Sequence, residues 1–218
     1  MARATLSISS KNYSSWSLRG WLLAKFAKLD FDEVVISPDD ANARKELLLL
    51  SSSMLVPCLT HQGIRVWDTL AIGEYLNEVK PLSGLLPKRR EARARCRSIC
   101  GEMHSGFSSL RSALPMNLKA HFPGHKIWVR AVADIDRINT IWRECLRDYG
   151  GPFLFGSKRC MADAMYAPVV TRFITYDVKL NRHCAQYARA IMAMPEMKTW
   201  IGAAKLEREE IDELDMEF

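Results

Sequence analysis

Three serines are the residues of this chain best placed to do chemistry, because they lie where a predicted strand gives way to a predicted helix. Ser14, Ser15 and Ser17 follow an alternating apolar run at residues 4–9 and open an amphipathic segment. The first N–H groups of a helix lack partners within the helix and carry the positive end of its dipole. Hydroxyl donors at that position could help to bind an anion or a thiolate. An ordinary N-cap is the alternative, since serine is a preferred cap residue.

A Val-Pro pair forms the second candidate site. Val56 and Pro57 open a short strand-like run that ends at a turn containing Gly63. Proline cannot donate to a β-ladder, so it belongs at the start of a strand or in a bend. A cis peptide bond before Pro57 would turn the backbone of Val56 outward, where its N–H and C=O groups could bind an extended, peptide-like ligand.

A carboxylate and a hydroxyl form the third candidate site. Asp68 and Thr69 lie in the cap region of a predicted helix that follows the strand-like run ending near Trp67. Such a pair can bind a ligand in which an ammonium group lies beside a carboxylate.

The hydrophobic pattern predicts the elements that must position these residues. Alternation or helical periodicity predicts strands at 4–9 and 33–36 and helices at about 17–28, 41–50 and 69–79. Two prolines and a glycine then interrupt both periods, which predicts a linker at 81–88 between a domain at 1–80 and a second domain at 89–218.

The second domain is predicted to be all-helical, because its apolar residues recur every three or four positions. The pattern predicts one long helix from Ala92 to Leu114, a turn region from Pro115 to Gly124, and further helices at 127–149, 162–179, 184–193 and 195–208. The acidic tail from Glu207 onward is expected to fray.

This order of pieces resembles the glutathione S-transferase superfamily, an α+β fold in which a thioredoxin-like N-terminal domain precedes an all-α C-terminal domain. The run from Ser14 to Arg19 looks like the serine motif of its zeta-like bacterial members. Phe153 to Gly156, followed by Met161 to Val170, is similar to the family's glycine turn and helix-capping segment. The resemblance extends over essentially the whole chain.

The resemblance implies a detoxifying enzyme that uses glutathione as co-substrate and needs no metal. Such an enzyme stabilises the thiolate of glutathione, which then attacks a small hydrophobic electrophile. Ser14 is the implied catalytic residue and Ser15 its close rival. Asp68 and Thr69 would bind the γ-glutamyl end of glutathione. The backbone of Val56, before Pro57, would pair with its cysteinyl part.

A second-substrate pocket is expected where the predicted helix 92–114 approaches the serine motif. Trp16, His104, Phe107 and Arg111 are its candidate residues, although helix packing with Arg111 in an ion pair is the alternative. Cys96, Cys100 and His104 share one helix face at a spacing that could chelate zinc. That face coincides with the apolar stripe and has no fourth ligand at motif spacing, so a core role is favoured over a metal site.

Three departures from the family pattern are present, and the first two keep other functions open, while the third bears on the cap of a helix. Trp16 replaces a cysteine associated with isomerase chemistry, Met54-Leu55 replaces a Gly-Lys pair, and Cys160 replaces a capping hydroxyl three residues before Asp163. The alternatives are a zeta-type isomerase and a noncatalytic ligand carrier or interaction module of the same fold.

Composition favours a cytoplasmic protein. The 218 residues hold six cysteines without a CxxC pair, which is typical of reduced, buried thiols. No apolar run is long enough to span a bilayer, and no secretory signal is recognisable. The net charge is +6, and the basic residues gather at 88–97 in a pattern typical of a solvated or subunit-facing helix surface rather than of nucleic-acid binding.

A homodimer is expected, as in other members of the fold. Arg65 and Trp67 would contribute one surface and the Arg89 to Arg97 face another, with Glu74 and Glu78 of the partner as candidate carboxylates.

Overall fold

A four-stranded sheet forms the N-terminal part of the computed structural model, which describes residues 4–36 and 56–208. The strands are β1 (Ala4–Ile8), β2 (Phe31–Val35), β3 (Cys58–His61) and β4 (Ile64–Val66), in the order β2-β1-β3-β4. β1 runs parallel to β2 and antiparallel to β3, and β3 runs antiparallel to β4. The strands predicted at 4–9 and 33–36 correspond to β1 and β2, although β2 begins two residues earlier and ends one residue earlier than predicted.

Two helices, α1 (Ser15–Phe26) and α3 (Thr69–Val79), pack against this sheet and against each other. The alternation of β1 buries Ala4, Leu6 and Ile8 beneath them, as a period of two requires. The bounds of α3 match the predicted helix 69–79, and α1 begins two residues earlier than predicted. The predicted helix 41–50 lies outside the described residues.

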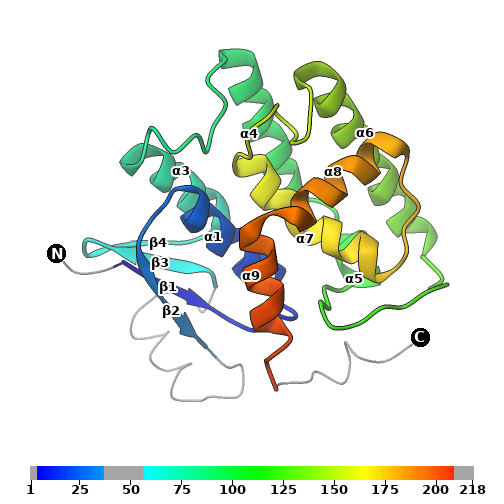
Figure 1. Ribbon diagram of the computed structural model, residues 1–218, viewed down its shortest axis with the longest axis horizontal. Coiled ribbons are helices and arrows are strands. Elements are labelled where there is room, and N and C mark those ends of the chain that lie inside the picture. The colour runs from blue at the N-terminus through cyan, green and yellow to red at the C-terminus, as the bar shows by residue number, and fades with distance from the viewer. Residues whose placement is uncertain (1–3, 37–55, 209–218) are drawn as a thin grey trace.

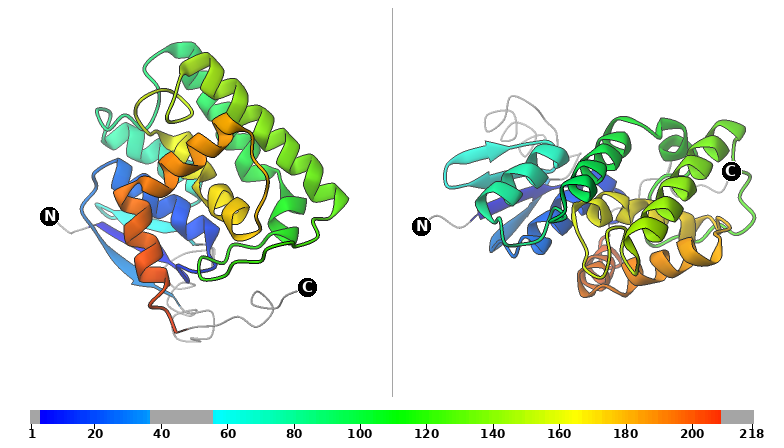
Figure 2. Two further views of the ribbon diagram at one scale, coloured as in Figure 1. Left: turned by 45° about the vertical axis from the view of Figure 1, so that its right-hand side comes forward. Right: turned by 90° about the horizontal axis from the view of Figure 1, so that it is seen from above.

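Between residue 80 and the end of the described chain at residue 208 there are six helices: α4 (Arg90–Ser105), α5 (Ser108–Ala113), α6 (Val129–Tyr149), α7 (Met161–Thr175), α8 (Arg182–Ala193) and α9 (Pro195–Ala204). Figures 1 and 2 show the sheet with α1 and α3 on one side of the molecule and α4 to α8 on the other. α7 is buried along nearly its whole length and contacts α1 and α4. The all-helical second half and the α+β class are as predicted.

The prediction of a single helix from Ala92 to Leu114 is wrong, because the helix ends at Ser105 and a second one begins at Ser108. Phe107 adopts a left-handed backbone conformation (φ 58°) directly after Gly106. The backbone N–H of Leu110 then donates to the carboxylate of Asp134 on α6, at 2.8 Å. A partner on another helix thus satisfies one of the donors that a helix start leaves free.

Asp163 and Cys160 form a capping box at the start of α7. Oδ2 of Asp163 accepts a hydrogen bond from the N–H of Cys160 (2.8 Å), and its Oδ1 accepts one from the N–H of Leu154 (3.1 Å). The carboxyl therefore joins the glycine turn to the start of α7. Burial raises the pKa of Asp163 to about 6.

Ion pairs within the chain use part of the basic surface on α4. The guanidinium of Arg97 donates to both carboxylate oxygens of Glu74 on α3, at 2.8 and 3.0 Å, and Arg95 contacts Glu144 on α6. Glu74, expected as a carboxylate for a partner's arginine, is thus engaged by Arg97 of its own chain.

All six cysteines are buried and free, as predicted. No helix among residues 4–36 and 56–208 is long and apolar enough to cross a membrane. The expectation that the tail frays from Glu207 is wrong for Glu207 itself, whose carboxylate binds the loop between β1 and α1. Residues 209–218 lie outside the described part of the chain.

Candidate active site

Ser14 is the N-cap of α1. Its hydroxyl accepts a hydrogen bond from the N–H of Ser17 (3.3 Å) and donates one to the hydroxyl of Ser17 (2.8 Å). The Ser17 hydroxyl in turn accepts from the N–H of Ser9, at 3.0 Å. The cap interpretation is therefore correct, and it leaves the Ser14 hydroxyl half-buried at the positive end of the helix dipole.

Ser15 is the first residue of α1 and is more deeply buried than Ser14. Its hydroxyl accepts a hydrogen bond from Nη2 of Arg172 on α7, at 3.2 Å. The Arg172 guanidinium also donates to the carbonyl groups of Arg111 and Leu114. Burial lowers the pKa of Arg172 to about 10, which leaves the guanidinium charged at neutral pH.

The Val56–Pro57 peptide bond is cis, and Pro57 is buried at the entrance to β3. Helix α1 packs directly on this proline through Gly20. A Cβ at Gly20 would lie 2.6 Å from both Cβ and Cγ of Pro57, closer than such atoms can approach. The glycine thus allows the helix that carries Ser14 to lie against the strand that begins at Pro57.

Asp68 is the N-cap of α3, and its Oδ1 accepts hydrogen bonds from the N–H groups of Leu70 (2.8 Å) and Ala71 (3.2 Å). Its other oxygen, Oδ2, lies 3.2 Å from Nε2 of His104 at the end of α4. The side chains of Asp68 and His104 remain 44% and 31% exposed, so a ligand can reach both of them. Thr69, directly after the cap, is buried.

Trp16 brings the helical domain to the serine motif. Its ring meets the ring of His104 edge-on, with the centroids 5.3 Å apart. The guanidinium carbon atoms of Arg19 and Arg111 lie 4.4 and 5.5 Å from the centroid of the Trp16 ring. A cationic group over an indole face is attracted by the π-electrons of the ring. Trp16, His104 and Arg111 are thus brought together as the sequence analysis expected.

Phe107, the fourth residue expected in this pocket, is buried at the turn between α4 and α5. Cys96 and Cys100 are fully buried, and a hydrogen bond with Cys100 together with burial raises the pKa of Cys96 well above its ordinary value. In the described residues no group of three or more metal-ligating side chains comes together.

Two buried arginines were missed by the sequence analysis. Arg19 donates to the carbonyl of Met165 on α7 (2.7 Å), while its Nη1 has no hydrogen-bond partner among the described residues. Burial, followed by the nearby charges of Arg172 and Arg111, holds the pKa of Arg19 well below its usual range. The sequence did contain a signal for them, because each of these arginines interrupts an apolar stretch of its helix. A charge buried among apolar residues needs specific partners, so such an arginine is a candidate for a structural or functional role.

Three features around Ser14 indicate the class of fold to which this site belongs. A serine caps the first helix beside a thioredoxin-like sheet, a cis-proline lies against that helix, and α7 of the helical part packs on the same helix. Residues 13–79 match the family model of the glutathione S-transferase N-terminal domain.

Curated relatives and solved structures agree with that assignment. The chain is 28% identical to the maleylacetoacetate isomerase of Rattus norvegicus over 170 residues (77% of this chain and 76% of the relative). It is 24% identical to the maleylacetoacetate isomerase of Dictyostelium discoideum over 196 residues (84% and 89%). A glutathione transferase homolog from Burkholderia, solved with bound glutathione, superposes with a TM-score of 0.72 at 22% identity, covering 94% of this chain and 99% of that one.

Residues 13–79 thus match a glutathione S-transferase N-terminal domain, and the chain as a whole is similar to maleylacetoacetate isomerases and to a glutathione transferase homolog. The family model and the enzyme relatives together support glutathione S-transferase activity.

Proposed function

We propose that this protein binds glutathione and uses the hydroxyl of Ser14 to stabilise its thiolate for attack on a small hydrophobic electrophile. The observation that carries this proposal is the position of Ser14, half-buried at the N-terminus of α1 and in contact with Ser17. A free thiol has a pKa of about 8.5, so little of it is thiolate at neutral pH. A donor at a helix N-terminus lowers that pKa by favouring the anion.

The hydroxyl hydrogen of Ser14 points to Ser17 in the ligand-free chain. Rotation about the Cβ–Oγ bond would redirect it to a sulfur atom, while Ser17 keeps its hydrogen bond from the N–H of Ser9. Ser15 is the alternative donor, because the guanidinium of Arg172 favours negative charge near its hydroxyl.

The rest of glutathione would lie along the edge formed by β3 and α3. The Val56 backbone before the cis-proline would pair with the cysteinyl part, and Asp68 with Thr69 would bind the γ-glutamyl end. The Burkholderia homolog with bound glutathione shares this fold and supports glutathione use. The electrophile would bind between Trp16, His104 and Arg111, with Phe107 behind them.

A second candidate function is the isomerisation of maleylacetoacetate, the substrate in the name of the curated relatives. One local observation favours it, since the partly exposed guanidinium group of Arg111 beside Trp16 suits a substrate with negative charge. Trp16 itself counts against it, because the resemblance implies a cysteine at that position in many relatives with this motif. A noncatalytic carrier of the same fold is the third possibility.

Calorimetric titration with glutathione, followed by assays with a panel of electrophiles and with maleylacetoacetate, tests these functions. Ser14→Ala is expected to lower kcat at least about tenfold with a smaller effect on glutathione affinity, because lost oxyanion-type donors act mainly on developing charge. Ser98→Ala, an exposed serine on α4, is the matched control.

Each contrary result has a definite meaning. An effect of Ser15→Ala without one of Ser14→Ala assigns the role to Ser15, and silence of both variants refutes serine activation. Faster isomerisation than conjugation favours the second function. Glutathione binding without turnover of any kind favours the carrier.

We also propose a homodimer and a cytoplasmic location. The six free, buried cysteines suit a reducing compartment. Ile64 and Trp67 expose apolar surface on and beside β4, where a partner could bind.

A further inference from the structure

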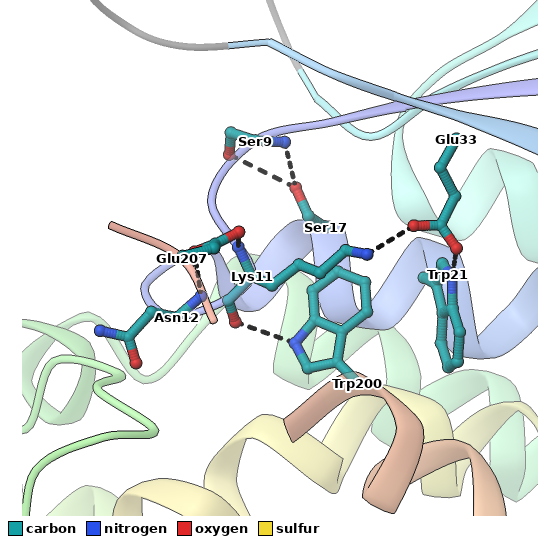
Figure 3. A network of polar contacts seen from close by, with 8 residues as sticks. All are labelled: Ser9, Lys11, Asn12, Ser17, Trp21, Glu33, Trp200 and Glu207. Carbon is teal, nitrogen blue, oxygen red and sulfur yellow. Dashed lines mark hydrogen bonds and ion pairs between the residues drawn. The ribbon is translucent and has the colours of Figure 1, made fainter. Parts of the chain in front are cut away.

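The loop that leads from β1 to Ser14 is held by a carboxylate from the other end of the chain. Glu207, three residues beyond α9, accepts a hydrogen bond from the Lys11 N–H on Oε1 (2.6 Å). Its Oε2 accepts from the Ser10 hydroxyl (2.7 Å) and from the Asn12 N–H (3.0 Å). Figure 3 shows Glu207 beside Lys11 and Asn12, close to the contact between Ser9 and Ser17.

We propose that Glu207 is a positioning residue for Ser14. The inference rests on the proposed function for its catalytic consequence. The carboxylate orders the loop at residues 10–13, and the loop fixes where the serine hydroxyl lies at the start of α1.

A continuous set of hydrogen bonds connects the two residues. The Ser10 hydroxyl, which donates to Glu207, also accepts from the N–H groups of Asn12 (3.1 Å) and Tyr13 (3.3 Å). The Ser10 carbonyl accepts from the N–H of Ser14, at 3.0 Å. The Ser10 hydroxyl is thereby hydrogen-bonded to the side-chain carboxylate of Glu207, and the Ser10 carbonyl is hydrogen-bonded to the backbone of Ser14.

Neighbouring contacts hold both ends of this connection in place. The indole N–H of Trp200 on α9 donates to the Lys11 carbonyl (2.9 Å), and the Trp200 ring packs on Trp21 of α1 at 5.3 Å. The Lys119 ammonium group donates to the Glu207 carbonyl at 2.6 Å. Glu207 therefore follows a well-anchored helix end and does not need to be ordered by the loop alone.

The buried side chain of Asn12 holds the loop from its other side. Its Oδ1 accepts from the N–H groups of Leu118 (2.7 Å) and Lys119 (3.1 Å). Its Nδ2 donates to the Asn117 side chain, at 3.1 Å. The loop is thus hydrogen-bonded both to the segment before α6 and to the segment after α9. Of these two sets of contacts, the second involves a charged side chain, the carboxylate of Glu207.

The negative charge matters because hydrogen bonds to a carboxylate are roughly twice as strong as neutral ones. A carboxylate accepts on both oxygens, and all three partners of Glu207 are donors. Glu207→Gln keeps the size of the side chain but turns an amide nitrogen, which cannot accept, toward one of those donors. Glu207→Asp keeps the charge on a shorter side chain.

The test uses the full chain with three variants: Glu207→Gln, Glu207→Asp and the control Asp136→Asn, which removes an exposed carboxylate from α6. Amide hydrogen exchange at Ser14 is measured first, since this N–H bonds to Ser10 and not to Glu207 itself. Kinetics with glutathione and the pKa of the bound thiol, followed by its thiolate absorbance, are measured next.

Glu207→Gln is expected to speed exchange at Ser14 about tenfold or more, as loss of a charge-assisted hydrogen bond would allow. It should also raise the pKa of bound glutathione and lower kcat, with little change in glutathione affinity. Glu207→Asp should lie closer to the wild type in all three measurements, and the control should match the wild type.

Unchanged exchange at Ser14 in Glu207→Gln overturns the proposal. Faster exchange with an unchanged thiol pKa and kcat also overturns it, because Glu207 is then only an anchor for the tail. If the wild-type chain binds no glutathione, the proposed function fails separately, and the exchange measurement alone decides whether Glu207 orders Ser14.

Discussion

Oδ2 of Asp68 lies 3.2 Å from Nε2 of His104, so the residue expected to bind the γ-glutamyl end of glutathione already contacts the helical domain. Its Oδ1 is engaged at the same time in capping α3. Asp68 thus caps α3 with one oxygen and faces His104 with the other. A substitution that tests ligand binding must therefore keep the helix cap.

Asp68→Asn is expected to weaken glutathione binding about tenfold or more while leaving the fold intact, because a charged hydrogen-bond partner is lost. Asparagine remains a good N-cap, so the Leu70 N–H keeps an acceptor. Calorimetry measures the affinity for glutathione, and thermal unfolding measures how much stability the helix cap contributes. Asp68→Ala removes both functions and should also cost about 0.5–2 kcal/mol of stability. An unchanged affinity in Asp68→Asn would remove this residue from the site.

Gly20→Ala is expected to destabilise the chain and to weaken glutathione binding together. The new Cβ would lie 2.6 Å from Pro57, and overpacking of this kind costs about 1–3 kcal/mol, more than the roughly 1 kcal/mol that alanine gains in a helix. Gly202→Ala on α9 is the control, since its Cβ would meet nothing within 4 Å. Thermal unfolding of both variants measures the difference, and equal melting temperatures would show that α1 can move away from Pro57 without cost.

The carboxyl of Asp163 should make stability depend on pH. Its pKa is about 6 in the folded chain against 3.8 for the exposed group, and burial is the first cause. The folded state therefore binds the proton more tightly, so this contribution is present below about pH 4 and is lost as the pH rises through about 6. The free energy of unfolding should fall over that window by on the order of 3 kcal/mol relative to Asp163→Asn.

Urea unfolding of the wild type and Asp163→Asn at several pH values measures this difference. Asp136→Asn, at an exposed position on α6, should follow the wild-type curve. Parallel curves for the wild type and Asp163→Asn would show that the Asp163 carboxyl titrates near its ordinary value.

Light scattering at micromolar concentration is expected to give twice the mass of one 24.8 kDa chain. Ile64→Lys places a charge on the β4 edge, where this side chain is 52% exposed, and should shift the protein toward the monomer. Val129→Lys, at an 87% exposed apolar residue of α6, should leave the dimer intact. A wild-type mass near that of one chain would refute the dimer and any role of the α4 arginines in it.

The sequence by itself determined the fold class and most of the elements. Alternation at β1 and the helical period of α3 are local patterns, and burial of one face fixes them wherever the segment packs. The cap at Ser14 and the proline before β3 are equally local, since each depends on backbone groups within a few residues.

Only the tertiary structure decided which distant residues meet at the candidate site. The helix predicted over 92–114 breaks at Phe107, where the donors of the new helix find Asp134 on α6. Arg172 reaches Ser15 from 157 residues away in sequence, and Glu207 reaches Ser10 from 197. No periodicity encodes such contacts, because they depend on how complete helices pack against one another, and that packing is a property of the folded chain as a whole.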